Sequence, residues 1–154
     1  AAWLGAPVER RLRRALLRAA GAAVRALHRA GVAHRDLNAK NVLLAAAPPR
    51  AWLIDFDGSA PPGAPLEPRD PRAIANLARL LRSAEKLGLW RPRSGAGAPL
   101  RDRDLLAFVR GYLPERRRDF GRAALGAAVV ASWARTIGWH RLAWRLFGRS
   151  PRRR

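Results

Sequence analysis

Residues 34–41 read "HRDLNAKN", and residues 53–59 read "LIDFDGS". The two stretches place Asp36 and Asp55 nineteen residues apart along the chain. An aspartate near an asparagine is usual in turns, so either stretch alone would predict little. Their joint occurrence, in a fixed order with the elements around them, predicts one site that carries two carboxylates.

Apolar residues around these stretches recur with the spacing of two kinds of element. Segment 7–30 repeats them at helical spacing, begins with a proline and stops before Gly31, which predicts an amphipathic helix. Short apolar runs at Val42–Ala45 and Ala51–Ile54, with two prolines between them, predict a hairpin. The ends of this hairpin would carry the two acidic motifs.

Downstream of the hairpin the pattern is mainly helical. Segments 59–71 and 91–99 are rich in proline and glycine and are predicted loops. Helices are predicted over 71–87 and 102–112, and the chain after Pro114 is expected to be helical or frayed. The predicted fold class is mainly α with a small β-hairpin, an α+β fold.

The order of helix, HRD with Asn five residues later, two strands and DFD resembles the C-terminal lobe of the protein-kinase-like superfamily. The resemblance implies that residues 1–112 form this lobe. Its catalytic loop would be 34–41 and its metal motif 55–57. Residues 113–154 would form a basic, helical C-terminal extension.

Enzymes of this superfamily hold ATP between two lobes, using a glycine-rich loop and a strand lysine of the N-terminal lobe. Ahead of His34 the sequence has only the predicted helix and the stub "AAWLGAPVE", without a lysine. Both lysines, Lys40 and Lys86, come later. We therefore expect the N-terminal lobe to be absent and this chain to be inactive alone.

The resemblance also implies roles for four side chains. Asp36 would be the catalytic base that accepts the proton of the attacking hydroxyl. Asn41 and Asp55 would supply the oxygen ligands that Mg²⁺ prefers, and so hold the metal of bound ATP. Lys40 would place its ammonium on the transferring phosphate. The expected cofactors are ATP and Mg²⁺.

Four other polar residues near the site are expected to be structural. His34 and Arg35 would brace the loop. Asp57 would cap the turn that follows it, or else add a second carboxylate near Mg²⁺. His28 is expected at the surface, at the end of the first helix, where it would complement the helix dipole and hold no ligand.

Three stretches resemble a narrower family, the bacterial Kdo kinases, which phosphorylate the 3-deoxy-D-manno-octulosonic acid (Kdo) sugar attached to lipid A. The stretches are "DLNAKNVLL" at 36–44, "WLIDFDGS" at 52–59 and "NLARLLRS" at 76–83. Lys40 stands where that family commonly has histidine. The resemblance implies ATP-dependent phosphorylation of the Kdo-lipid A precursor in lipopolysaccharide core biosynthesis, at the cytoplasmic face of the inner membrane.

The spacing after the metal motif argues against a protein substrate. Fifteen residues separate Asp55 from Pro71, and no "APE" motif follows, so a peptide-binding platform has no room. Two alternatives remain open. One is another small-molecule or sugar kinase, and the other is a truncated, non-catalytic lobe that binds an anionic membrane.

The charge of the chain predicts that it binds an anionic partner or surface. The formal net charge is +20, and residues 114–154 hold 11 arginines against 2 acidic residues. Tryptophans and arginines lie on opposed sides of a helical wheel, which is typical of interfacial helices. We expect residues 121–137 to pack on the lobe and 139–154 to contact membrane. Nucleic acid is not an expected partner, because no nucleic-acid-binding motif is present.

Overall fold

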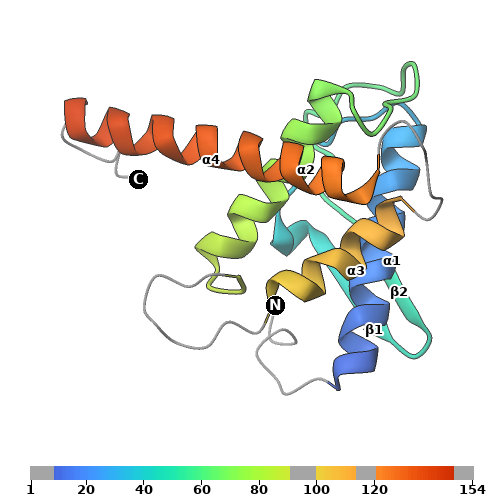
Figure 1. Cartoon of the computed structure of the whole chain (residues 1–154). Helices are drawn as coiled ribbons and strands as arrows, with labels where there is room; N and C mark the ends of the chain where they lie inside the picture. The colour runs from blue at the N-terminus through green and yellow to red at the C-terminus, as the bar shows by residue number, and fades with distance from the viewer. Residues whose placement is uncertain (1–8, 91–99, 114–120, 148–154) are drawn as a thin grey trace.

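The structure is a computed structural model that describes residues 9–90, 100–113 and 121–147, with side chains up to residue 135 in the last segment. The elements follow in the order α1 (Arg10–Arg29), the 3₁₀ helix η2 (Ala39–Asn41), β1 (Val42–Ala46), β2 (Pro49–Leu53), α2 (Pro71–Lys86), α3 (Asp102–Tyr112) and α4 (Arg122–Phe147). The predicted fold, mainly helical with one hairpin, is confirmed (Figure 1).

Helix bounds agree closely with the periodicity of the sequence. Helix α3 has the predicted bounds, and α2 ends at Lys86, one residue before the predicted end. Helix α1 begins at Arg10, and residues 7 and 8 of the predicted helix lie outside the described part of the chain. Asp70 caps α2 by accepting a hydrogen bond from the backbone N–H of Arg72 at 2.8 Å.

The second strand was predicted two residues too late. Strand β2 begins at Pro49 and pairs antiparallel with β1, with Ala46 opposite Pro49 and Val42 opposite Leu53. A proline is tolerated there because it occupies the first position of an edge strand, where no ladder N–H is required. This register places the residues before β1 and after β2 next to each other.

Helices α1 and α3 approach each other closely through two glycines. A Cβ atom at Gly21 of α1 would meet the carbonyl oxygen of Phe108, and a Cβ atom at Gly111 of α3 would meet the carbonyl oxygen of Arg18. Only glycine leaves space for backbone contact of this kind. The contact brings Tyr112, at the end of α3, beside α1.

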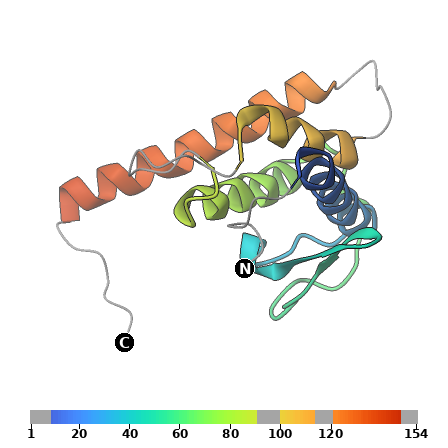
Figure 2. The ribbon, with the colours of Figure 1, turned by 90° about the horizontal axis from the view of Figure 1, so that it is seen from below.

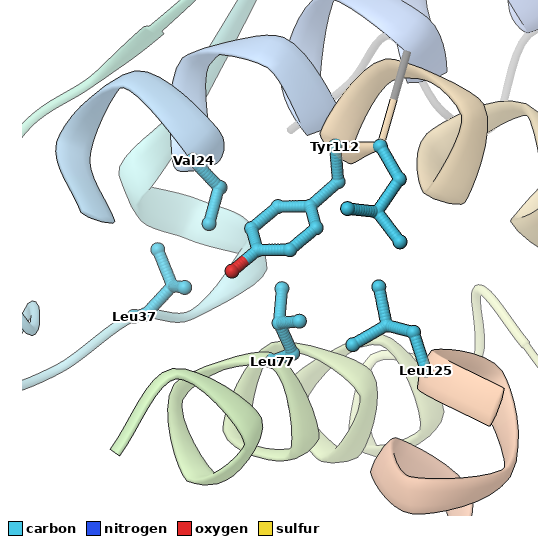
Figure 3. Close-up of a cluster of buried hydrophobic side chains, with 6 residues drawn as sticks. Val24, Leu37, Leu77, Tyr112 and Leu125 are labelled. Carbon is cyan, nitrogen blue, oxygen red and sulfur yellow. The ribbon is translucent and has the colours of Figure 1, made fainter. Parts of the chain in front are cut away.

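The hydrophobic core gathers side chains from all the long helices. Figure 3 shows the ring of Tyr112 extending from α3 into the space between Val24 of α1 and Leu77 of α2, with Leu37 and Leu125 around it. Tyr112 and Val24 are fully buried, and Leu125 of α4 is 1% exposed. The core therefore includes the first turns of α4 as well as the segments around the catalytic loop.

Helix α4 lies across α2, and its C-terminal half extends beyond the other helices (Figures 1 and 2). Trp133 of α4 meets Trp90 edge to face, with ring centroids 5.4 Å apart, which confirms the predicted packing as far as residue 135. The side chains of the predicted membrane-contact segment 139–154 lie outside the described residues. None of the described helices combines the length and apolar character that a membrane span requires.

An apolar cavity of about 420 Å³ lies between the helices. Its walls include Leu17 of α1, Leu80 of α2, Leu105 of α3 and Val129 of α4. Ala39 also lines it, so the cavity reaches the underside of the catalytic loop.

Candidate active site

Asn38 shapes the turn of the loop that follows Asp36. Its Oδ1 accepts the backbone N–H groups of Lys40 at 2.8 Å and Asn41 at 3.2 Å, which caps η2. Its Nδ2 donates to the carboxylate Oδ2 of Asp36 at 2.9 Å and to the carbonyl of Asp36 at 3.3 Å. Asn38 thus holds the Asp36 carboxylate and the following turn in one arrangement.

Asn41 and Asp36 are joined by a second hydrogen bond. The Nδ2 of Asn41 donates to the carbonyl oxygen of Asp36 at 3.0 Å, and Asn41 itself is only 7% exposed. Because Nδ2 faces this carbonyl, Oδ1 of Asn41 is the atom left to coordinate a cation or accept a hydrogen bond. Asp36 is exposed, so its carboxylate is accessible to a ligand.

Ile54 connects the catalytic loop with the second acidic motif. Its backbone N–H donates to the carbonyl of Asn41 at 3.1 Å, and its carbonyl accepts a hydrogen bond from Nε2 of His34 at 3.0 Å. The next residue is Asp55, which is exposed and has a φ of 64°. Such a backbone is sparsely populated by residues other than glycine, and it is found often at functional sites.

His34 braces the loop, as predicted. It is 1% exposed, its Nδ1 accepts the backbone N–H of Asp36 at 3.1 Å, and its ring lies 4.9 Å from that of Phe56. A backbone N–H can only donate, so Nδ1 is unprotonated and the ring proton sits on Nε2, where it reaches Ile54. The same imidazole therefore contacts both acidic motifs.

Arg35 also braces the loop. Its backbone N–H donates to Oγ of Ser59 at 3.2 Å, and its guanidinium lies against Gly58, where a Cβ atom would sit 2.9 Å from Arg35 Cδ. Gly58 has a φ of 68° in a turn that is closed by a hydrogen bond from Ser59 N–H to the Phe56 carbonyl at 2.9 Å. The turn closes through the backbone, and the role of Asp57 stays a prediction.

Lys40 lies on the same loop as Asp36. It is exposed on η2, and in the described part of the chain its ammonium forms no ion pair. An exposed ammonium on the same loop as Asp36 suits contact with an anionic ligand.

The donor set near Asp55 fits a divalent cation only in combination with a ligand. Among the described residues, no group of three or more acidic or histidine side chains could hold a metal. Mg²⁺ usually takes one or two protein carboxylates and completes its shell with water and substrate phosphates. Asp55, with Oδ1 of Asn41 turned away from Asp36, matches that pattern.

Two residues of α2 hold the loop, and they are the first and last residues of the stretch "NLARLLRS", which by itself predicted no role for either of them. Asn76 contacts the main chain of His34 with both ends of its amide, at 3.0 and 2.7 Å, and Oγ of Ser83 accepts the N–H of Ala39 at 3.0 Å. They stand seven residues apart, on one face of the helix. Polar residues on an otherwise apolar helical face are the signal that could have identified them.

The prediction of a surface position for His28 was wrong. His28 is fully buried, with Nδ1 2.7 Å from the hydroxyl of Tyr112 and Nε2 3.3 Å from Oδ1 of Asn76. Its helical position alone suggested exposure, but α3 and α2 cover this side of α1. Burial lowers the pKa of His28 and raises the pKa of Tyr112 to about 12, because each ionised form would lose its hydration.

A family model, curated relatives and a solved structure all relate this chain to lipopolysaccharide kinases. The family model "Lipopolysaccharide kinase (Kdo/WaaP) family" matches residues 1–112. The 3-deoxy-D-manno-octulosonic acid kinases of Xylella fastidiosa strains M12 and 9a5c are 46% identical over 67 residues, which is 44% of this chain and 25% of each relative. A solved structure described as WaaP in complex with acyl carrier protein superposes with a TM-score of 0.61 at 30% identity.

These matches are partial in length. The superposition covers 86% of this chain and 53% of the solved chain, and the match to the Xylella kinases spans a quarter of their length. The similar region of the solved chain is therefore about half of that protein.

Proposed function

This chain belongs to the lipopolysaccharide kinase (Kdo/WaaP) family, and on that premise we propose that it serves the transfer of the γ-phosphate of ATP to a hydroxyl of the Kdo sugar on a Kdo-lipid A precursor. The observation that carries the proposal is the pair of hydrogen bonds at Ile54. They hold Asp55 beside the loop that presents Asp36. The identity to Kdo kinases supports this acceptor over other sugars.

In the proposed reaction Asp36 orients the sugar hydroxyl and accepts its proton. Asn38 occupies Oδ2 of the Asp36 carboxylate, which leaves Oδ1 to face the acceptor. The exposed ammonium of Lys40 stabilises the negative charge that spreads over the oxygens of the transferring phosphoryl group. Both groups act from a loop whose backbone is fixed by Asn38, Asn76 and Ser83.

Asn41 and Asp55 would hold Mg²⁺, which when bound neutralises phosphate charge and orients the nucleotide. The chain contributes a fixed Oδ1 from Asn41, because the other end of that amide is held by the Asp36 carbonyl. It contributes the Asp55 carboxylate from a backbone with positive φ.

We also propose that the protein works at the anionic cytoplasmic face of the inner membrane. The net charge of +20 supports this location, since each basic residue near an anionic leaflet contributes about 1 kcal/mol of attraction. The alternatives are a kinase for another sugar and a non-catalytic lobe that binds the membrane.

Phosphate transfer to a defined acceptor tests the proposed function. The full-length protein, incubated with labelled ATP, Mg²⁺ and Kdo-lipid A precursor, should label the sugar. Asp36→Asn should lower the rate by about 100-fold or more, within the range for a lost general base. The matched control Glu9→Gln removes an exposed carboxylate away from the loop and should leave the rate unchanged.

Three outcomes would contradict the proposal. Equal labelling by wild type and Asp36→Asn would exclude the proposed base, and labelling of another core sugar in preference to Kdo would favour the second kinase reading. A protein that binds anionic vesicles but transfers no phosphate to any acceptor would favour the non-catalytic lobe. The same assay on residues 1–154 tests the expectation that this chain is inactive alone.

A further inference from the structure

A chain of buried polar side chains runs behind the catalytic loop. Tyr112 and His28 are fully buried, His34 is 1% exposed and Asn76 is 6% exposed. They come from α3, α1, the loop and α2, and only His34 belongs to a motif of the active site. Buried polar groups without partners would destabilise the fold, so the order of their hydrogen bonds matters.

The orientation of the Asn76 amide is determined by the backbone of His34. Oδ1 of Asn76 lies 3.0 Å from the His34 nitrogen, and Nδ2 lies 2.7 Å from the His34 carbonyl oxygen. The backbone N–H can only donate and the carbonyl can only accept, so the amide has one possible orientation.

This orientation determines the proton of His28. Its Nε2 is 3.3 Å from Oδ1 of Asn76, an atom that only accepts, so Nε2 carries the proton. Its Nδ1 is 2.7 Å from the Tyr112 hydroxyl and accepts that O–H when the ring is neutral. Burial, which lowers the pKa of His28, keeps the ring neutral at pH 7.

The ring of His34, whose main chain Asn76 holds, has backbone partners that fix its own proton in the same way. Asp36 N–H donates to Nδ1 of His34, and Nε2–H of His34 donates to the carbonyl of Ile54, the residue before Asp55. Every proton from Tyr112 to Ile54 therefore has one position. A change of tautomer at either histidine would set two donors or two acceptors against each other.

We propose that His28 and Asn76 are positioning residues, which hold the backbone of the catalytic loop and the Ile54–Asp55 segment in register through a single ordered set of protons. The proposal rests on the proposed kinase function for its catalytic consequence. Neither residue touches a reacting atom, and both act through His34.

The wild-type protein gives the first test. The chain contains three histidines, His28, His34 and His140, so their ring nitrogens can be assigned by ¹⁵N NMR of histidine-labelled protein. At pH 7 the signals of His28 should be those of the neutral ring, and in both His28 and His34 the proton should sit on Nε2. A charged His28 ring, or a proton on Nδ1 of either residue, would overturn the inference.

A matched pair of variants tests the coupling. His28→Leu removes the donor to Asn76, whereas His28→Gln keeps an amide N–H of similar reach and an oxygen that accepts from Tyr112. The leucine change should speed amide exchange at His34 and Asp36 by about 10-fold or more, in line with the loss of one buried hydrogen bond. The tautomer of His34 should stay as it is, because Asp36 N–H and the Ile54 carbonyl fix it. The glutamine change should restore both exchange rates to within about 3-fold of wild type.

A control variant separates general destabilisation of the fold from displacement of the catalytic loop. Leu81→Ala, in the second core cluster, destabilises the fold without touching the polar chain. It should leave amide exchange at His34 and Asp36 unchanged. Equal effects of Leu81→Ala and His28→Leu on His34 and Asp36 would overturn the inference, and Tyr112→Phe provides a milder variant if His28→Leu does not fold.

Kinetics then separate the positioning role from the proposed function itself. In the full-length protein His28→Leu should lower kcat by about 100-fold, with KM for Mg-ATP within about 3-fold of wild type, since a misplaced loop affects transfer more than binding. Absence of transfer by wild type would contradict the proposed function, while the NMR result would still decide whether the protons are ordered. A lowered kcat in His28→Leu that His28→Gln does not restore would contradict the positioning role.

Discussion

The buried pair of His28 and Tyr112 makes stability depend on pH at both ends of the range. Burial lowers the pKa of His28 below its usual value, and Arg25 nearby acts in the same direction. Burial raises the pKa of Tyr112 to about 12. Both groups are therefore held neutral in the folded protein over a wider range than in the unfolded chain.

The sign follows from which state binds more protons. Below about pH 6.5 the unfolded chain protonates His28 while the folded protein does not, so its contribution to stability is lost as pH falls. Above about pH 10 the unfolded chain ionises Tyr112 while the folded protein keeps its proton, so stability is lost as pH rises toward 12. Both contributions are fully present between these limits.

Denaturant unfolding at a series of pH values tests this dependence. Relative to wild type, His28→Gln should remove an acid-side slope of up to about 1.4 kcal/mol per pH unit, and Tyr112→Phe should remove a similar alkaline-side slope. Each variant serves as the control for the other. Parallel curves for all three proteins on both sides would contradict the assignment.

Among the elements, α1 and α3 depend on the two glycines at their crossing. Gly111→Ala would press a methyl group against the backbone of Arg18. Backbone cannot rotate away as a flexible side chain can, so the two helices would have to move apart. We expect a loss of about 1–3 kcal/mol in the free energy of unfolding. Gly21→Ala, against the Phe108 carbonyl, should cost a similar amount.

The fourth helix offers a matched control for these substitutions. Apart from its own helical turn, no described heavy atom lies within 4 Å of the position that a Cβ of Gly126 in α4 would take. Gly126→Ala should therefore stabilise the protein by up to about 1 kcal/mol, through helix propensity alone. Thermal or denaturant unfolding of the three variants measures the contrast, and a destabilising Gly126→Ala with a neutral Gly111→Ala would contradict the packing seen here.

At the scale of the whole molecule, charge dominates the expected behaviour. The net charge of +20 should bind the protein to vesicles that contain anionic lipid, and binding should weaken about 10-fold or more between 0.1 and 1 M salt. Vesicles of zwitterionic lipid are the control. Sedimentation that is independent of salt and of lipid charge would contradict electrostatic attachment.

The sequence predicted much of the architecture, and its errors have specific causes. The observed bounds of α3 agree with the predicted ones, because the spacing of apolar residues that predicts a helix is local in the sequence. The start of β2 was missed, because the pairing of Pro49 with Ala46 depends on the partner strand. The loop motif identified Asp36, Lys40, Asn41 and Asp55, and the structure brings them to one place, while their roles remain proposals.

The residues that hold the site were harder to predict than the residues that form it. Asn76 meets His34 across 42 positions of sequence, and Tyr112 meets His28 across 84. The sequence alone determined the helices, the hairpin and the order of the acidic motifs, because those depend on local spacing. Only the tertiary structure decided which polar groups are buried and which tautomers they adopt, because a buried hydrogen bond requires a partner that folding brings from a distant element.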